Sequence, residues 1–104
     1  METYRFDLAA PRPAAGERQL VLVGVVASGN LEVLLERRAP SGRCIIEVST
    51  PARGFRPLWD AIVKDFVARR GAGGLHISIN DGGARPDTVS LRLAQGVQVI
   101  ESEG

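Results

Sequence analysis

The first half of the chain contains short apolar runs with the two-residue period of β-strands. Residues 19–26 form a β-branched run with apolar residues on both faces, which predicts a strand near the middle of a sheet. Residues 31–36 and 43–48 alternate between apolar and more polar positions, so each is predicted to be a strand with one buried face. Turns containing glycine separate these runs, and the residues before position 9 are compatible with a further edge strand.

Between Phe55 and Arg70 the apolar period changes to that of an α-helix. The apolar residues lie three and four positions apart, and they are Phe55, Leu58, Trp59, Ile62, Val63, Phe66 and Val67. Pro57 falls in the first turn, where a missing amide costs little, and two arginines followed by Gly71 form a basic last turn and a stop. This helix is predicted to pack on the sheet with its aromatic side chains in the core.

Alternation returns in the last third of the chain. Residues 75–80 ("LHISIN") and 88–93 ("TVSLRL") are predicted to be two strands joined by a hairpin through "DGGARPD", and residues 97–100 to extend the sheet. We therefore predict an α+β fold, an antiparallel β-sheet of about five strands with one amphipathic helix packed on one face, in the order β-β-β-α-β-β. Residues 1–104 are expected to form a single domain.

Composition and charge narrow the class of protein. With 104 residues, 44% hydrophobic and 24% charged, the chain resembles ordinary globular domains, and no apolar run approaches the ~20 residues of a membrane helix. Thirteen basic against twelve acidic residues give a formal charge of +1, which argues against a nucleic-acid binder. The opening "METYRFDLAA" lacks the basic and apolar layout of an export signal, so we expect a cytoplasmic protein.

Few residues have the spacing that catalysis or metal binding requires. Cys44, the only cysteine, lies in an apolar strand and is expected to be a buried thiol, and the single histidine, His76, cannot form a common metal site alone. Glu32 and Glu36 share one strand face and are expected to be solvated. Ser28 lacks the G-x-S-x-G elbow of hydrolases. By elimination, the sequence favours a binding or carrier module.

The segment "ASGN", residues 27–30, has two interpretations. Serine, glycine and asparagine are common in hairpin turns, so turn formation alone explains the segment. The same turn would place the Ser28 hydroxyl at a hairpin tip, where Gly29 offers little steric resistance to a modifying enzyme. The local pattern leaves both interpretations open.

A family resemblance bears on this choice. The run "VVASGNLEVLLE" resembles the segment around the modified serine in the acyl carrier subunit, or delta subunit, of bacterial malonate decarboxylase. The helix tryptophan, Trp59, and the run "LHISINDGGARPDTVSLRLAQG" also look like this family, and the similarity covers nearly the whole chain. Ala27 stands where ordinary helical acyl carriers have Asp, and Asn30 stands where Asp is expected to be common in this family.

The resemblance implies a carrier that is not itself an enzyme. Ser28 would carry 2'-(5''-phosphoribosyl)-3'-dephospho-CoA through a phosphodiester, with Gly29 supporting the turn, and the terminal thiol of the group would hold acetyl and malonyl thioesters. The partners implied are the acyltransferase and decarboxylase subunits of malonate decarboxylase, the prosthetic-group transferase and a malonyltransferase. No metal, nucleic acid or membrane is implied. Arg37, Arg38 and Arg53 are interpreted either as docking residues or as a solvated surface.

Two alternatives accompany this hypothesis. One is the carrier of a related lyase that uses the same prosthetic group, such as citrate lyase. The other is an adaptor or stability subunit in which the turn at Ser28 is unmodified; an adduct on Ser41 or Ser49 would refute Ser28 as the attachment residue.

Overall fold

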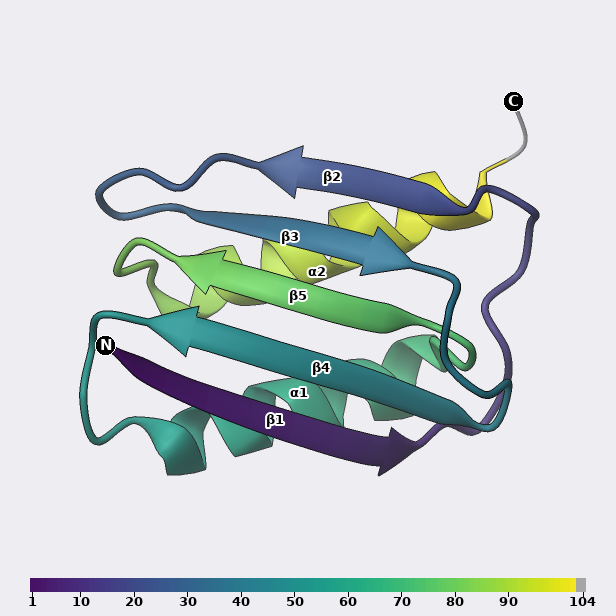
Figure 1. The fold of residues 1–104 in the computed structure, drawn as a ribbon, viewed down its shortest axis with the longest axis horizontal. Coiled ribbons are helices and arrows are strands. Elements are labelled where there is room, and N and C mark those ends of the chain that lie inside the picture. The colour runs from purple at the N-terminus through teal and green to yellow at the C-terminus, as the bar shows by residue number, and fades with distance from the viewer. Residues whose placement is uncertain (103–104) are drawn as a thin grey trace.

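The computed structural model, which describes residues 1–102, contains one five-stranded sheet with two helices on one of its faces (Figure 1). In chain order the elements are β1 (Glu2–Ala9), β2 (Leu20–Gly24), β3 (Leu31–Glu36), β4 (Arg43–Thr50), α1 (Arg56–Arg70), β5 (His76–Asp81) and α2 (Pro86–Glu101). The α+β class and the five-stranded sheet are therefore confirmed. No helix within residues 1–102 is long and apolar enough to cross a membrane.

The strands lie in the order β1-β4-β5-β3-β2. Three of the four neighbouring pairs are antiparallel, and β4 and β5 are parallel because α1 connects them across one face of the sheet. The sequence predicts a sheet that is antiparallel throughout, and the parallel β4–β5 pair differs from that prediction. Both helices lie behind the sheet in Figure 1, and the opposite face of the sheet is uncovered.

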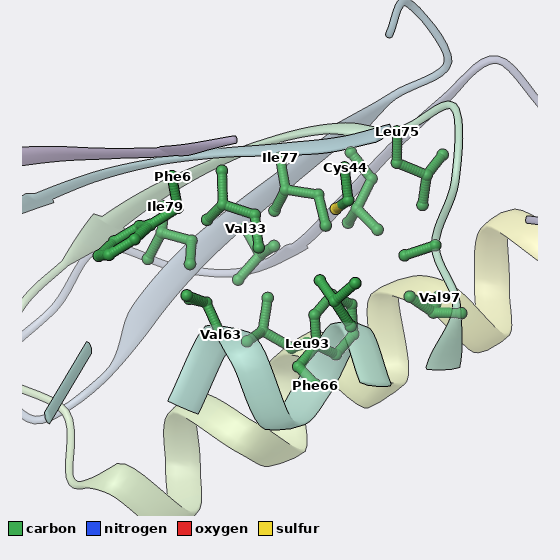
Figure 2. Packing of buried hydrophobic residues seen from close by; sticks show 14 of the residues in the cluster. Phe6, Val33, Cys44, Val63, Phe66, Leu75, Ile77, Ile79, Leu93 and Val97 are labelled. Carbon is green, nitrogen blue, oxygen red and sulfur yellow. The ribbon is translucent and has the colours of Figure 1, made fainter. Parts of the chain in front are cut away.

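The core lies between the sheet and the two helices. Alternate residues of β3, β4 and β5 point inward, including Val33, Ile77 and Ile79, and they meet Val63 of α1 and Leu93 of α2 (Figure 2). The alternation found in residues 31–36 and 43–48 is thus the pattern of strands with one buried face, as predicted.

The predicted helix is α1, and most of its apolar stripe is buried. Trp59, Val63 and Phe66 lie in the core, as expected. Phe55 and Leu58 do not, since they are 50% and 41% exposed. Phe55 is the residue before the first helical turn. It belongs to the connection from β4 and is not part of the helix face that packs on the sheet.

The strand predicted at residues 88–93 and the sheet extension predicted at residues 97–100 are wrong, because both belong to α2. The buried residues of α2 follow a helical period, and they are Val89, Leu93, Gly96, Val97 and Ile100. Leu91, which made the segment look like a strand, is exposed on the helix. Gly96 is needed for packing, because a Cβ there would lie 2.5 Å from Cδ1 of Leu35 on β3.

β2 is shorter and less buried than predicted. It ends at Gly24 and forms an edge of the sheet rather than its middle. Of its residues, Val21 is buried, whereas Leu20 and Leu22 face the uncovered side and are more than half exposed. Apolar residues on both faces of this run therefore mark a strand whose outer face is left open.

Candidate functional site

The connection between β2 and β3 contains a tight turn with Ser28 at its tip. The amide of Asn30 donates to the carbonyl of Ala27 over 2.9 Å, which closes a four-residue β-turn over Ala27, Ser28, Gly29 and Asn30. Gly29, the third residue, has a φ of 76°, as type II turns require. Glycine adopts this left-handed conformation without the strain that a side chain would add. The hairpin predicted at this position is confirmed.

The Ser28 side chain is exposed, together with the whole stretch from Val25 to Gly29. A Cβ built on Gly29 would have no atom within 4 Å, so the space beside the serine is open. Within residues 1–102, no hydrogen bond or ion pair involves the Ser28 hydroxyl. No base among the described residues is therefore in contact with it, and the hydroxyl has the weak nucleophilicity of an ordinary alcohol.

The turn rests on the connection between β5 and α2. The amide of Gly29 donates to the carbonyl of Gly82 over 2.9 Å, and the amide of Gly82 donates to the carbonyl of Asn30 over 2.8 Å. Figure 1 shows these two connections side by side at one end of the sheet. A Cβ on Gly82 would overlap the carbonyl oxygen of Ala27, so only glycine permits this approach. The serine turn is thus held by two backbone hydrogen bonds to a distant segment.

Asp81 fixes that supporting segment. Its carboxylate is buried and accepts hydrogen bonds from the Thr50 hydroxyl and from the amide of Ala84, both over 2.8 Å. These bonds join the end of β4 to the start of the β5–α2 connection. The sequence signal for this role was the Asp before Gly82 and Gly83, which we had interpreted as a hairpin between two strands.

Arg92 of α2 also contacts the serine turn, a contact that no local sequence pattern indicates. Oδ1 of Asn30 accepts from the amide of Leu31 over 2.8 Å and from Nε of Arg92 over 3.3 Å. Nη1 of Arg92 donates to the side-chain oxygen of Gln95 over 2.9 Å. Asn30 therefore links the base of the turn to the second helix through its side-chain amide oxygen.

The other candidate residues lie elsewhere. Cys44 is fully buried, and desolvation together with the charge of Asp7 raises the pKa of its thiol to about 12. This confirms the expected buried thiol.

His76, at the opposite end of β5 from Asp81, is buried between Arg38 and Glu47, with Nε2 3.3 Å from Oε1 of the glutamate. Within residues 1–102, no three His, Cys, Asp or Glu side chains are grouped as metal ligands.

Glu32 and Glu36, predicted to be solvated, lie half-buried on the uncovered sheet face. The two side chains have different neighbours. Asn80 donates to Glu32 over 3.3 Å, and Arg38 forms an ion pair of 3.2 Å with Glu36.

Of the three arginines considered for docking, Arg37 has a structural role. Its guanidinium donates to the carbonyls of Arg18, Ala14, Ala15 and Ile100, so it joins the segment before β2 to the end of α2. These bonds within the chain account for its position, and a role of Arg37 in docking stays a prediction. Arg38 is paired on the sheet face, and Arg53 is exposed before α1.

Comparison with known proteins gives consistent matches. The family model of the malonate decarboxylase delta subunit matches residues 18–100. The malonate decarboxylase acyl carrier protein of Bradyrhizobium diazoefficiens is 54% identical over 104 residues, covering 100% of this chain and 99% of that protein. The protein of the same name from Xanthomonas euvesicatoria is 50% identical, covering 97% and 96%. A chain in a crystal structure of a Pseudomonas malonate decarboxylase hetero-tetramer in complex with malonate superimposes with a TM-score of 0.85 at 40% identity, covering 96% of this chain and 99% of that chain.

Proposed function

This chain belongs to the malonate decarboxylase delta-subunit family and is an acyl carrier subunit of that complex, and on this premise we propose that Ser28 is the attachment residue for 2'-(5''-phosphoribosyl)-3'-dephospho-CoA. Gly29 supports the turn that presents it. The group, once attached, supplies a terminal thiol that holds acetyl or malonyl as a thioester. The carrier of a citrate lyase, one of the two alternatives, is set aside by the family match.

The observation that carries this proposal is the exposed Ser28 hydroxyl on a rigid turn. The side chain faces solvent, and the space beside Gly29 is open, so a bulky phosphodiester fits without moving the chain. The two hydrogen bonds to Gly82 hold the turn in place. A fixed anchor under a long flexible group leaves the thiol free to move between active sites while the attachment point stays constant.

The chemistry of attachment has to come from a partner enzyme. The Ser28 oxygen forms the new bond to phosphorus of an activated donor, the bond from that phosphorus to the donor's leaving phosphate group breaks, and the hydroxyl loses its proton. Since no base of this chain contacts that hydroxyl within residues 1–102, the proton passes to a group of the prosthetic-group transferase. The acyl-transfer and decarboxylation steps belong to the acyltransferase and decarboxylase subunits and to a malonyltransferase. The chain itself acts as a carrier without catalytic groups.

The residues around Ser28 support recognition by these partners. Val25 and Val26 directly precede the turn and are 54% and 53% exposed, and Leu22 of β2 is 58% exposed. These three exposed aliphatic side chains precede the attachment residue within six positions of the chain, and each offers apolar area that a partner can cover. The transferase and the catalytic subunits all need to approach the same serine, so we propose that they contact these neighbouring aliphatic side chains.

Mass spectrometry tests the attachment site. We expect the intact protein from its native host to carry one large adduct, and Ser28→Ala to lack it while keeping the fold. Ser41→Ala is a matched control, because Ser41 is also an exposed serine in a turn. An adduct that persists in Ser28→Ala, or that maps to Ser41 or Ser49, would contradict the proposal. No adduct on the wild-type protein would favour the remaining alternative, an unmodified adaptor.

A further inference from the structure

Arg92 is a half-buried cation that has no acidic partner within residues 1–102. Its two hydrogen bonds go to the amide oxygens of Asn30 and Gln95, and Nη2 makes none. Some other arginines of the chain are paired with acids, for example Arg43 with Asp7 at 2.8 Å and Arg69 with Asp65 at 3.0 Å. A partly desolvated guanidinium without an anion is costly, and it strongly attracts a phosphate.

The position of Arg92 is fixed at the base of the serine turn. Its Cδ lies 3.4 Å from the position that a Cβ on Gly24 would occupy, so the side-chain stem packs beside the last residue of β2. Asn30 Oδ1 is itself held by the amide of Leu31, and it orients Nε of Arg92. The guanidinium is therefore anchored from both sides, with its remaining N–H groups available.

Ser28 is only two residues from the contact of Arg92. Two residues span at most about 7 Å even when extended, and here the chain between Ser28 and Asn30 is folded into the turn closed by the Ala27 carbonyl. A phosphate ester on Ser28 would extend beyond the hydroxyl, and the attached group contains further phosphates. The guanidinium is thus within reach of an anion attached at this site.

We infer that Arg92 forms an anion-binding site for a phosphate of the prosthetic group attached to Ser28, an inference that rests on the proposed function. The Nη groups of Arg92 donate to phosphate oxygens, while Nε keeps its bond to Asn30. Such bonds between guanidinium and phosphate are charge-assisted and directional. The bond would hold the first part of the long arm against the β2–β3 hairpin, and the distal thiol would stay mobile. Arg92 is therefore a positioning residue.

The experiment compares the unmodified and modified forms of four proteins: wild type, Arg92→Gln, Arg92→Lys and Arg70→Gln. Arg70, an exposed arginine in the last turn of α1, is the control, and α1 ends at the opposite end of the sheet from the β2–β3 turn (Figure 1). The modified wild-type protein and Arg70→Gln should each melt about 2–6 °C above their unmodified forms. Arg92→Gln should lose this difference, and Arg92→Lys should keep part of it. The ³¹P resonance of the ester should shift in Arg92→Gln and stay unchanged in Arg70→Gln.

A second measurement needs no variant. In the wild-type protein, the Nη–H signal of Arg92 should become more protected from exchange after modification. The inference is overturned if this signal does not change, or if Arg92→Gln keeps the full melting difference and an unshifted ³¹P resonance. Intact mass, measured first, separates this failure from that of the proposed function. An adduct on Ser28 with unchanged behaviour of Arg92 overturns only the anion site, whereas the absence of any adduct overturns both.

Discussion

The amide of Gly29 donates to the carbonyl of Gly82, so the turn that presents Ser28 is bonded to a connection far away in the sequence. The amide of Gly82 returns a bond to Asn30, which makes the contact reciprocal. Through Asp81, the same connection is joined to Thr50 at the end of β4. The geometry of the candidate site therefore depends on β4 and β5 as well as on the β2–β3 hairpin.

Gly82→Ala should displace the serine turn. The added methyl group would overlap the carbonyl oxygen of Ala27, so we expect a loss of about 1–3 kcal/mol in the free energy of unfolding. Modification of Ser28 by the transferase should also slow. Gly42→Ala is the control, because a Cβ there meets no atom within 4 Å. Urea denaturation and the rate of adduct formation measure both effects, and equal behaviour of the two variants would contradict the steric argument.

Gly29→Ala and Gly29→Asn should differ in stability. There is space for a side chain at this position, so the cost comes only from the φ of 76°. Alanine in this conformation costs about 1–2 kcal/mol, whereas asparagine tolerates it better. We expect the urea midpoint to fall more for alanine than for asparagine. Identical midpoints would show that the left-handed conformation of residue 29 is not maintained in solution.

The Cys44 thiol should not react with thiol reagents in the folded, unmodified protein. Its side chain is fully buried, and its pKa is raised to about 12. In denaturant the same thiol should react completely. The modified protein should show one reactive thiol when folded, from the prosthetic group, and two when unfolded. Titration with a chromogenic disulfide measures these numbers, and a reactive thiol in the folded, unmodified protein would contradict the burial of Cys44.

The same pKa predicts a loss of stability at alkaline pH. The unfolded thiol ionises near its ordinary value of 9.0, while the folded thiol keeps its proton up to about 12. Between these values the unfolded state binds fewer protons, so the free energy of unfolding should decrease by up to about 1.4 kcal/mol per pH unit. Cys44→Ala should lack this contribution. Denaturation curves in reducing buffer at several pH values test it, and equal slopes for both proteins would refute it.

Asp81→Ala should loosen the connection beneath the serine turn. The substitution leaves the buried hydroxyl of Thr50 and the amide of Ala84 without their acceptor, which should lower the free energy of unfolding by about 1–3 kcal/mol. Hydrogen exchange at the Ala84 amide should accelerate. Thr50→Val keeps the carboxylate bonded to Ala84, so this amide should stay protected in that variant. Fast exchange of the Ala84 amide in Thr50→Val would contradict the role of the Asp81 carboxylate as the acceptor that protects this amide.

Arg37→Gln should be more harmful than Arg38→Gln. Arg37 donates to four carbonyls from two segments, whereas Arg38 forms an exposed ion pair with Glu36. We expect a loss of about 2 kcal/mol for the first substitution and less than about 1 kcal/mol for the second. Limited proteolysis should cut the segment before β2 sooner in Arg37→Gln. Equal stabilities would argue against the structural role of Arg37.

Local patterns in the sequence correctly predicted the helices and strands in which apolar residues repeat along the whole element with the period of that element. Strands β3 and β4 and helix α1 are examples, since each buries one face. Helix α2 was missed for a physical reason. Val89, Leu91 and Leu93 alternate over a short window like a strand, and Gly96 disfavours a helix, but the close approach of Leu35 requires that glycine. The packing partner lies on another element and leaves no local signal.

The candidate site was predictable only in part. Turn composition and the family resemblance both pointed to Ser28 and Gly29. The supporting residues Gly82, Asp81 and Arg92 come together with the turn only after β5 pairs with β3 and α2 packs behind the hairpin. Such contacts depend on the order of the strands in the sheet, and the periodicity of a single segment does not predict that order.

The burial of Cys44 has a consequence for the retention of an acyl group on the proposed prosthetic group. A thioester on a mobile arm can lose its acyl group to any accessible thiolate by transthioesterification. The chain has a single cysteine, and its sulfur points into the core (Figure 2). An acyl group held as a thioester on the proposed arm would therefore meet no competing thiolate on the polypeptide.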